Sequence, residues 1–508
     1  MTEQSPPANL RRTVARGATV ATVGSLFSKT LTLAVYVALA RLAPPETFGT
    51  FAAASVLVWF GALFVESGMT AALIHRRDRI EEAASTAFLS TLATGLGLSV
   101  LGAAVAPLVG LYFGSHQITI VAAAVSGLHL LNAAAVVPEA LLQRRFSFVR
   151  RTIVDPLSVI AYGTSAAIGL TYGLGVWALA LAVYVSEVVR VTLDWSLGGW
   201  RPDLRRASWP MWRELVGYAR HVFAGEFLRQ FGGVFNTAAI GRFLGRAELA
   251  QYNFGYRLAT ETSAPIITAV SFVLFPALAR ISTEKERFGS AVLESFRFAC
   301  FVVFPVSLIL FSLGEPLAVL LLGERWRPAG SVVAGLAAVG AALSLRSISS
   351  EVFKASGHPE RLPRIYALSA ALPAVAVLTG LPFGLIAIAS GVSVAFIVVA
   401  VYATTSAARL AGIQPTTLIR AVLPSGLASV TMTAALYPLE HLAIHADHRG
   451  AAVGISLLAT EVILGAAIYL SVVYVLDPTM AKGFLHNIRG AWKSRASAEI
   501  ATGDLPPA

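Results

Sequence analysis

The chain has 508 residues, of which 56 % are hydrophobic and 13 % are charged, and its mean hydropathy is +0.70. This composition leaves too little polar surface to cover a soluble globule, so it excludes a soluble enzyme and predicts a polytopic membrane protein. A net charge of +11 would suggest nucleic-acid binding in a soluble chain. Here the basic residues lie in short connections between apolar runs, which indicates membrane topology and no nucleic-acid partner.

Long apolar runs recur from Gly17 to Leu476. Each is long enough to cross a hydrocarbon core of roughly 30 Å as a helix. The runs lack the alternation of barrel strands, so the predicted fold is all-α. We predict about fourteen transmembrane helices, with boundaries uncertain by several residues, at 17–40, 49–74, 84–112, 118–142, 152–172, 175–199, 214–241, 248–277, 288–321, 329–353, 365–382, 384–408, 421–440 and 451–476.

One helix-turn-helix pattern occurs twice in the chain. Aligning Arg41 with Arg242 places Phe48 over Leu249. Six predicted spans precede the basic connection 199–213, so the second half starts on the same side as the first, which predicts two six-helix bundles related by a parallel pseudo-twofold axis. The predicted divisions are a cytoplasmic N-terminal segment (1–16), an N-terminal bundle (17–199), a cytoplasmic linker (200–213), a C-terminal bundle (214–409), two extra transmembrane helices (410–478) and a cytoplasmic tail (479–508).

The distribution of Lys and Arg gives the predicted orientation. With both termini in the cytoplasm, most basic residues outside the spans fall in the cytoplasmic segments. The predicted external segments hold Arg41, Arg242, Arg246, Arg325, Arg327 and Arg449. The excess on one side therefore predicts a multi-pass protein with cytoplasmic N- and C-termini.

Charges inside the predicted spans are the candidate functional residues, because a charge at the centre of a membrane is costly and usually faces a cavity or a partner. Some cations have an acid at helical spacing, which favours a structural ion pair. These pairs are Glu187 with Arg190, Glu226 with Arg229, Arg257 with Glu261, and Glu294 with Arg297. Lys29 and Arg346 have no such acid, so they require a partner from another helix or an anionic substrate.

Together, Lys29, Arg229, Arg257 and Arg346 are expected to make the walls of a cleft between the bundles positive. A cationic, partly dehydrated cavity suits a phosphate or pyrophosphate group, which arginine binds in a forked geometry.

Glu66 and Asp155 are the candidates for coupling to a proton or cation gradient, with a helix-end structural role as the alternative. Glu461 is a weaker candidate. We predict no metal site, because His441, His445 and His448 lie in an external turn. The external connections are short, and no nucleotide motif or nucleophile–base pair is present, so we expect no enzyme and no cofactor.

A set of local strings resembles a known family. They are, in chain order, LARLAPPETFGTF, ESGMTAALIHRRD, LNAAAVVPEALLQRRFSF, AAIGRFLGRAELAQYNFGYRLA, FPALARI, LLGERWRP and FKASGHPER. In this combination they resemble the polysaccharide transporter family of oligosaccharide flippases (Wzx-like), within the multidrug/oligosaccharidyl-lipid/polysaccharide (MOP) exporter superfamily. Relatives tend to carry a cation where Lys29 stands, and an acid where Asn236 stands.

The resemblance implies a flippase in the bacterial inner membrane. It would move undecaprenyl-pyrophosphate-linked oligosaccharide repeat units to the outer leaflet for exopolysaccharide, capsule or O-antigen synthesis, by alternating access coupled to a proton or sodium gradient. The implied partners are the lipid-linked oligosaccharide, the bilayer, and the polymerase and glycosyltransferases of the same pathway, and a monomer is expected to suffice. A drug or metabolite antiporter, a lipid II flippase and a membrane-bound polymerase remain as alternatives.

Overall fold

The computed structural model describes residues 8–66, 68–76, 78–144, 148–262, 274–480 and 482 of the chain, and the regular structure in them is helical. The helices of the first part are α1 (Ala8–Leu42), α2 (Pro45–Ala54), α3 (Val56–Glu66), α4 (Met69–His75), α5 (Ile80–Phe113), α6 (His116–Val125), α7 (Leu128–Arg144), α8 (Phe148–Thr171) and α9 (Val176–Gly198). The second part holds α10 (Trp209–Phe243), α11 (Arg246–Glu261), α13 (Lys285–Leu322), α14 (Arg327–Gly335), α15 (Ala337–Ala355), α16 (Leu362–Gly380), α17 (Leu385–Leu410), α18 (Pro415–Pro438) and α19 (Ala451–Leu476).

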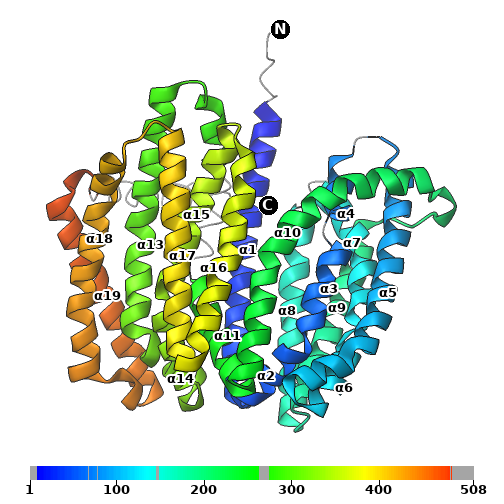
Figure 1. Cartoon of the computed structure of the whole chain (residues 1–508), viewed down its shortest axis with the longest axis horizontal. Coiled ribbons are helices and arrows are strands. Elements are labelled where there is room, and N and C mark those ends of the chain that lie inside the picture. The colour runs from blue at the N-terminus through cyan, green and yellow to red at the C-terminus, as the bar shows by residue number, and fades with distance from the viewer. Residues whose placement is uncertain are drawn as a thin grey trace, which may run out of the picture.

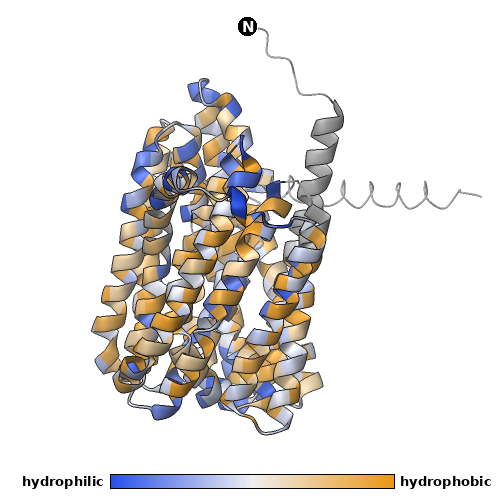
Figure 2. Cartoon of the chain, turned by 90° about the vertical axis from the view of Figure 1, so that its right-hand side faces the viewer, coloured by the Kyte–Doolittle hydropathy of each residue, from blue (hydrophilic) through white to orange (hydrophobic). Residues whose placement is uncertain are grey.

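The chain is a multi-pass membrane protein. In the part of the chain that the structure describes, 10 helices are long and apolar enough to cross a membrane, or up to 11 if the bent pair Glu324–Gly335 and Ala337–Ala355 is one span. Hydrophobic residues predominate along the long helices, and hydrophilic residues gather in the connections at the two ends (Figure 2). The number of fourteen spans stays a prediction. Residues 263–273 of the predicted span 248–277 lie outside the described residues.

Three predicted spans contain a break or a bend in the helix. The predicted span 49–74 is divided into α2, α3 and α4, with breaks at Ser55 and between Glu66 and Met69. The span 118–142 is broken between α6 and α7, and the span 329–353 bends by 43° between α14 and α15. Apolar composition predicts that a segment crosses the membrane but does not detect a bend, because neighbouring helices can satisfy the backbone groups that a break releases.

Helix contacts repeat along the chain. In the first part α1 packs against α8, α8 packs against α9, and α5 packs against α6 and α7. In the second part α10 packs against α16, α16 packs against α17, and α13 packs against α14 and α15. Helices α18 and α19 add to the outer side of the second group by packing on α13 (Figure 1).

One end of the molecule is closed by a close contact between α2 and α11. A Cβ atom at Gly49 of α2 would lie 1.7 Å from the carbonyl oxygen of Arg246, so only glycine permits this approach. Beside it, Phe48 and Phe254 pack edge to face at 5.1 Å between ring centroids. The indole nitrogen of Trp326, which is fully buried, donates a hydrogen bond of 2.9 Å to the carbonyl oxygen of Ala40. Side chains of both parts therefore form a common apolar core at this end.

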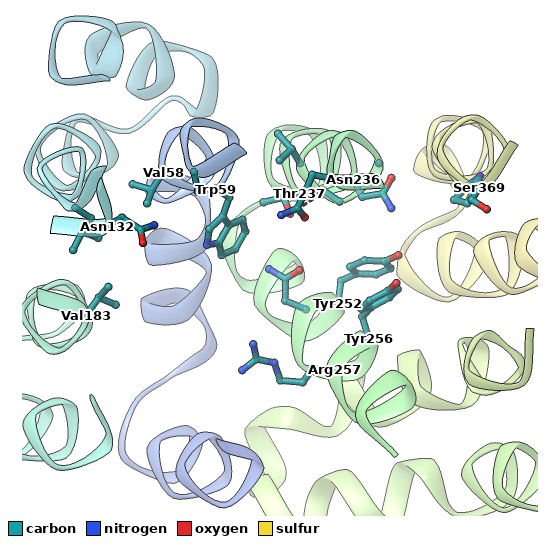
Figure 3. A pocket seen from close by; sticks show the side chains of 18 of the residues that line it. Val58, Trp59, Asn132, Val183, Asn236, Thr237, Tyr252, Tyr256, Arg257 and Ser369 are labelled. Atoms are coloured by element: carbon teal, nitrogen blue, oxygen red, sulfur yellow. Dashed lines mark hydrogen bonds between the residues drawn. The ribbon is translucent and has the colours of Figure 1, made fainter. Parts of the chain in front are cut away.

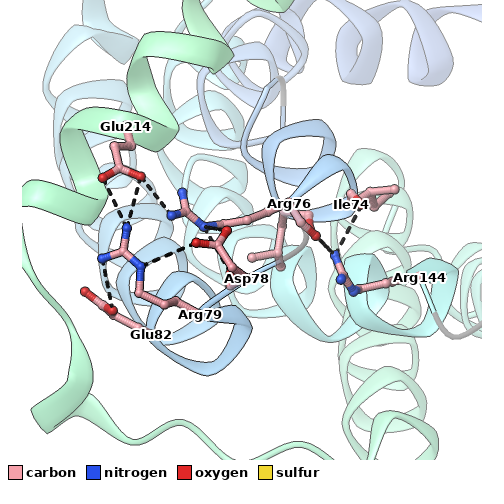
Figure 4. Close-up of polar contacts among 8 residues, drawn as sticks. Ile74, Arg76, Asp78, Arg79, Glu82, Arg144 and Glu214 are labelled. Carbon is pink, nitrogen blue, oxygen red and sulfur yellow. Dashed lines mark hydrogen bonds and ion pairs between the residues drawn. The ribbon is translucent and has the colours of Figure 1, made fainter.

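At the opposite end the apolar cores of the two parts are separate. One core gathers residues of α13, α15, α16, α17 and α18, and another gathers residues of α4, α5, α7 and the start of α10. The first turns of α10 are held to the first group by charge, because Glu214 contacts Arg76 at 2.8 Å and Arg79 at 3.3 Å (Figure 4). Arg144 donates hydrogen bonds to the carbonyl oxygens of Leu73 and Ile74 in the same region. Helix α10 thus passes from one helix group to the other.

Replacing Gly49 with Ala should destabilise the protein, because the added methyl group has no space against the α11 backbone. We expect the free energy of unfolding to fall by about 1–3 kcal/mol, as in other overpacked sites. Unfolding in detergent followed by tryptophan fluorescence measures this change. Gly97→Ala is the matched control, since nothing lies within 4 Å of its added Cβ. Equal stability of the two variants would contradict the close α2–α11 contact.

Candidate functional site

A cavity of about 730 Å³ lies between the two helix groups. Its walls come from α3, α7 and α9 on one side and from α10, α11, α16 and α17 on the other. Figure 3 shows Trp59 and Asn132 of the first group facing Asn236, Tyr252 and Arg257 of the second across this space. Because residues of both groups line the cavity, a change in the angle between the groups would change its shape.

A second cavity of about 300 Å³ adjoins the first, next to α1, α2 and α8. The two cavities share a wall formed by Trp59, Asn253, Tyr256 and Arg257. Three of these four residues lie on α11, so one face of this helix separates the cavities. A ligand in either cavity would contact the same side chains of α11.

Arg257 is the cation that both cavities share. Its guanidinium lies 3.7 Å from the centroid of the Tyr36 ring, which holds it by a cation–π contact. Its Nη1 atom is buried and has no hydrogen-bond partner among the described residues. A buried guanidinium nitrogen without an acceptor is costly. Arg257 therefore presents an unused donor at the wall between the cavities.

Lys29 has a partner from another helix, one of the two possibilities that its sequence context left open. Its Nζ atom lies 2.9 Å from Oε2 of Glu261 on α11. The sequence predicts that Glu261 pairs with Arg257. In the structure the Oε2 atom of Glu261 instead forms an ion pair with Lys29, which joins α1 to α11. Glu261 lines the smaller cavity, so the ion pair stands at its edge.

The opposite wall of the larger cavity carries acidic residues around one arginine. Arg190 of α9 lies 3.0 Å from Glu139 of α7 and 3.9 Å from Glu187. The second contact confirms the pair predicted from helical spacing. Glu187 and Arg190 line the cavity. The α9 wall of the cavity therefore carries one acidic and one basic side chain, Glu187 and Arg190, and the α11 wall carries the basic side chain of Arg257.

Of the remaining predicted site residues, Arg346 and Asp155 are described, and neither lines the two cavities. The Nη1 atom of Arg346 donates a hydrogen bond of 3.3 Å to Ser369, which lines the larger cavity. Asp155 lies on α8 with an exposed side chain and is not among the lining residues. The side chains of Glu66 and Arg229 lie outside the described residues. The structure thus brings Arg257, Lys29 and Glu261 together around the smaller cavity. Arg346 lies behind Ser369, which lines the larger cavity.

Several lining residues were not predicted from the sequence, and most of these are uncharged. A signal for some of them is present on α11, where Asn253, Tyr256, Arg257, Thr260 and Glu261 recur at helical spacing on one face. All five line the smaller cavity. Such a polar stripe on one helix face indicates a wet surface inside a membrane protein. Glu139, the partner of Arg190, has no comparable signal, since the contact joins residues 51 positions apart.

Comparison with known proteins assigns a family. The family model described as "Polysaccharide biosynthesis protein" matches residues 38–352. The chain is 26 % identical over 305 residues to the succinoglycan biosynthesis transport protein ExoT of Rhizobium meliloti, covering 59 % of this chain and 60 % of that one. It is 21 % identical over 362 residues to the lipopolysaccharide biosynthesis protein WzxC of Escherichia coli, covering 68 % of this chain and 70 % of that one. The match spans about three fifths of the length of ExoT.

Solved structures agree on the fold. The lipid II flippase MurJ in an inward closed conformation matches with a TM-score of 0.73 at 14 % identity, over 91 % of this chain and 99 % of that one. An inward-facing multidrug resistance MATE family transporter of the MOP superfamily matches with a TM-score of 0.62 at 15 % identity, over 76 % and 94 % of the two chains. This likeness shows the MOP-type fold.

The Lys29–Glu261 ion pair should contribute little to stability, because the two side chains are 38 % and 34 % exposed. In a double-mutant cycle of Lys29→Met and Glu261→Gln we expect a coupling energy of at most about 1 kcal/mol. The Arg297–Asp477 pair, with side chains 21 % and 13 % exposed, is the comparison and should couple more strongly. Unfolding in detergent measures both cycles. Stronger coupling at Lys29 than at Arg297 would contradict the partly hydrated position of the first pair.

Proposed function

This chain belongs to the polysaccharide biosynthesis protein family, a family of transporters and not of enzymes, and from that premise we propose that it is a lipid-linked oligosaccharide flippase. The proposed cargo is an undecaprenyl-pyrophosphate-linked repeat unit for exopolysaccharide, capsule or O-antigen synthesis. The observation that carries the proposal is the unpartnered, buried Nη1 atom of Arg257 on the wall shared by two cavities. A pyrophosphate oxygen would supply the missing acceptor.

The arrangement of charges supports an anionic head group. Arg257 stands beside the Lys29–Glu261 pair, and an anion arriving there would meet both cations while Glu261 already compensates one of them. The centroid of the Tyr36 ring lies 3.7 Å from the guanidinium carbon, and the Nη1 atom of Arg257 still has no hydrogen-bond partner among the described residues. We propose that the sugars occupy the larger cavity, whose Asn132, Gln230 and Asn253 amides suit hydroxyl groups.

We further propose alternating access between the two helix groups. The closed end depends on contacts such as that of Gly49 with the α11 backbone, and the other end has separate apolar cores. We propose that residues 17–199 and 214–409 move as two six-helix bundles in a monomer. Residues 410–478 would form two additional helices. Glu66 and Asp155 would couple the movement of the bundles to a proton or sodium gradient. The proposed partners are the polymerase and glycosyltransferases of the same pathway.

Replacing Arg257 with Gln should impair transport, because Gln keeps polarity but lacks the charge that binds an anion. A lost charge-assisted hydrogen bond of about 1.5–3 kcal/mol corresponds to roughly a tenfold to hundredfold weaker affinity. In cells lacking the protein, the variant should leave undecaprenyl-linked repeat units in the inner leaflet, and Arg257→Lys should restore part of the export. Both are measured as lipid-linked oligosaccharide accessible from outside the cell.

Arg420→Gln is the matched control, since Arg420 is exposed on α18 and lines neither cavity. It should export like the unaltered protein. Repeat units that still reach the outer leaflet in cells lacking the protein would contradict the flippase proposal. Unchanged export by Arg257→Gln would leave the flippase in place but remove Arg257 as its pyrophosphate ligand.

The proposed orientation places both termini in the cytoplasm. The single cysteine, Cys300, is 1 % exposed and gives a low labelling background. A membrane-impermeant thiol reagent on intact spheroplasts should therefore label Arg449→Cys and should label Arg201→Cys only after lysis. Both positions are exposed. They belong to the connection before α19 and the connection between α9 and α10, which lie at opposite ends of the protein (Figure 1). The reverse pattern would overturn the orientation.

A further inference from the structure

Two buried carboxyl groups face each other between α18 and α19, away from both cavities. The buried face of α19 consists of residues at helical spacing: Gly454, Leu458, Glu461, Gly465, Tyr469 and Val473. On either side of Glu461 the two chain segments approach closely. A Cβ atom at Gly465 would lie 2.6 Å from Leu436, and one at Gly454 would lie 2.5 Å from the carbonyl oxygen of Ala446. Glu440, in the turn between these two contacts, is thereby held opposite Glu461.

Burial leaves these carboxyl groups with few partners. Glu440 is 2 % exposed and Glu461 is 1 % exposed. One oxygen, Oε1 of Glu440, accepts a hydrogen bond of 2.8 Å from the backbone N–H of Ala446. The other oxygen of Glu440 and both oxygens of Glu461 are buried and have no partner among the described residues. Apolar side chains of α13 and α19, including Leu313, Leu320 and Leu458, pack around this place.

Several basic groups of the neighbouring segments have partners other than the two carboxyl groups. In residues 315–327 and 437–450, the other charged and titratable groups are Glu315, Glu324, Arg325, Arg327, Tyr437, His441, His445, Asp447, His448 and Arg449. Arg327 contacts Glu315 and Asp447, each at 2.7 Å. His441 contacts the Tyr437 carbonyl oxygen, and Arg449 donates to that of Ile444. In the described part of the chain none of these groups donates a hydrogen bond to Glu461.

Two ionised carboxylates at this place would repel each other in a medium of low dielectric constant, without a cation to offset the cost of burial. One proton removes the conflict, because a carboxylic acid donates a strong hydrogen bond to a neighbouring carboxylate. A metal ion would need additional oxygen ligands, and the described residues contain no group of three or more potential ligands. We propose that Glu440 and Glu461 form a proton-binding site, in which one shared proton fastens α19 to the end of α18.

This site differs from the transport cavities in position and in role. It lies in the two helices that follow the repeated contacts, at the same end as the closed α2–α11 contact (Figure 1). The adjacent Arg327–Asp447 pair connects the turn after α18 to α14. Loss of the shared proton would place two like charges between α18 and α19 and loosen their packing on the second helix group. The proposal is independent of the cargo that the protein carries.

Carbodiimide labelling of the full-length protein in detergent tests the site, because a hydrophobic carbodiimide reacts with protonated, buried carboxyl groups. At about pH 6, peptide mass spectrometry should find Glu461 or Glu440 modified at least about tenfold more than Glu315, and the modification should decrease as pH rises. Glu315 is the internal control, since its Oε1 atom forms an ion pair with Arg327 at 2.7 Å. Absence of the excess labelling would overturn the proposal, and so would protection by Na⁺ at constant pH, which would indicate a cation site.

Glu461→Gln gives a second test that does not depend on labelling. Gln can donate a hydrogen bond to Glu440 at every pH, as the protonated Glu461 does in the unaltered protein. The melting temperature of the unaltered protein should therefore fall between about pH 6 and about pH 9, while that of Glu461→Gln should fall less. The matched variant Glu315→Gln should keep the pH dependence of the unaltered protein. Parallel curves for Glu461→Gln and the unaltered protein would overturn the proposal.

Discussion

The cost of placing ionised side chains inside a membrane protein organises this structure. Each such charge needs an opposite charge, a polar partner or water. Arg190 forms an ion pair with Glu139, and Lys29 forms an ion pair with Glu261, in both cases on a different helix. Arg297 is held by Asp477 beyond the end of α19. These contacts join helices that are distant in sequence, so the need to compensate charge also determines which helices stay together.

Three side chains carry the two proposals, and each has at least one buried atom of its charged group without a hydrogen-bond partner among the described residues. The Nη1 atom of Arg257 lies where two cavities meet, and the carboxyl groups of Glu440 and Glu461 lie where two outer helices meet. The first is an unused donor and fits an anionic head group. The others are surplus acceptors and fit a proton. The same physical rule therefore underlies both proposals, a cargo site at Arg257 and a proton site at Glu440 and Glu461, within one helical framework.

Packing determines where the cavity lies. At one end the two helix groups share an apolar core and meet through a glycine, Gly49, against a backbone carbonyl. At the other end each group has its own core, and α10 is fastened to the first group by Glu214. Related transporters with this fold carry different cargo, so the fold supplies the opening between the groups, and the side chains on its walls select what enters.

The sequence by itself determined the class of protein, most of its membrane helices and two of the four predicted local ion pairs, Glu187 with Arg190 and Glu294 with Arg297. Apolar runs long enough to cross a bilayer require helices, and the contact of Glu187 with Arg190 follows from the helical repeat. The tertiary structure alone decided that Glu261 pairs with Lys29, that Arg346 donates a hydrogen bond to Ser369 of the larger cavity, and that Glu440 lies next to Glu461. Helical spacing fixes neighbours within about one turn, whereas partners between helices depend on how the helices pack, and no local pattern encodes that choice.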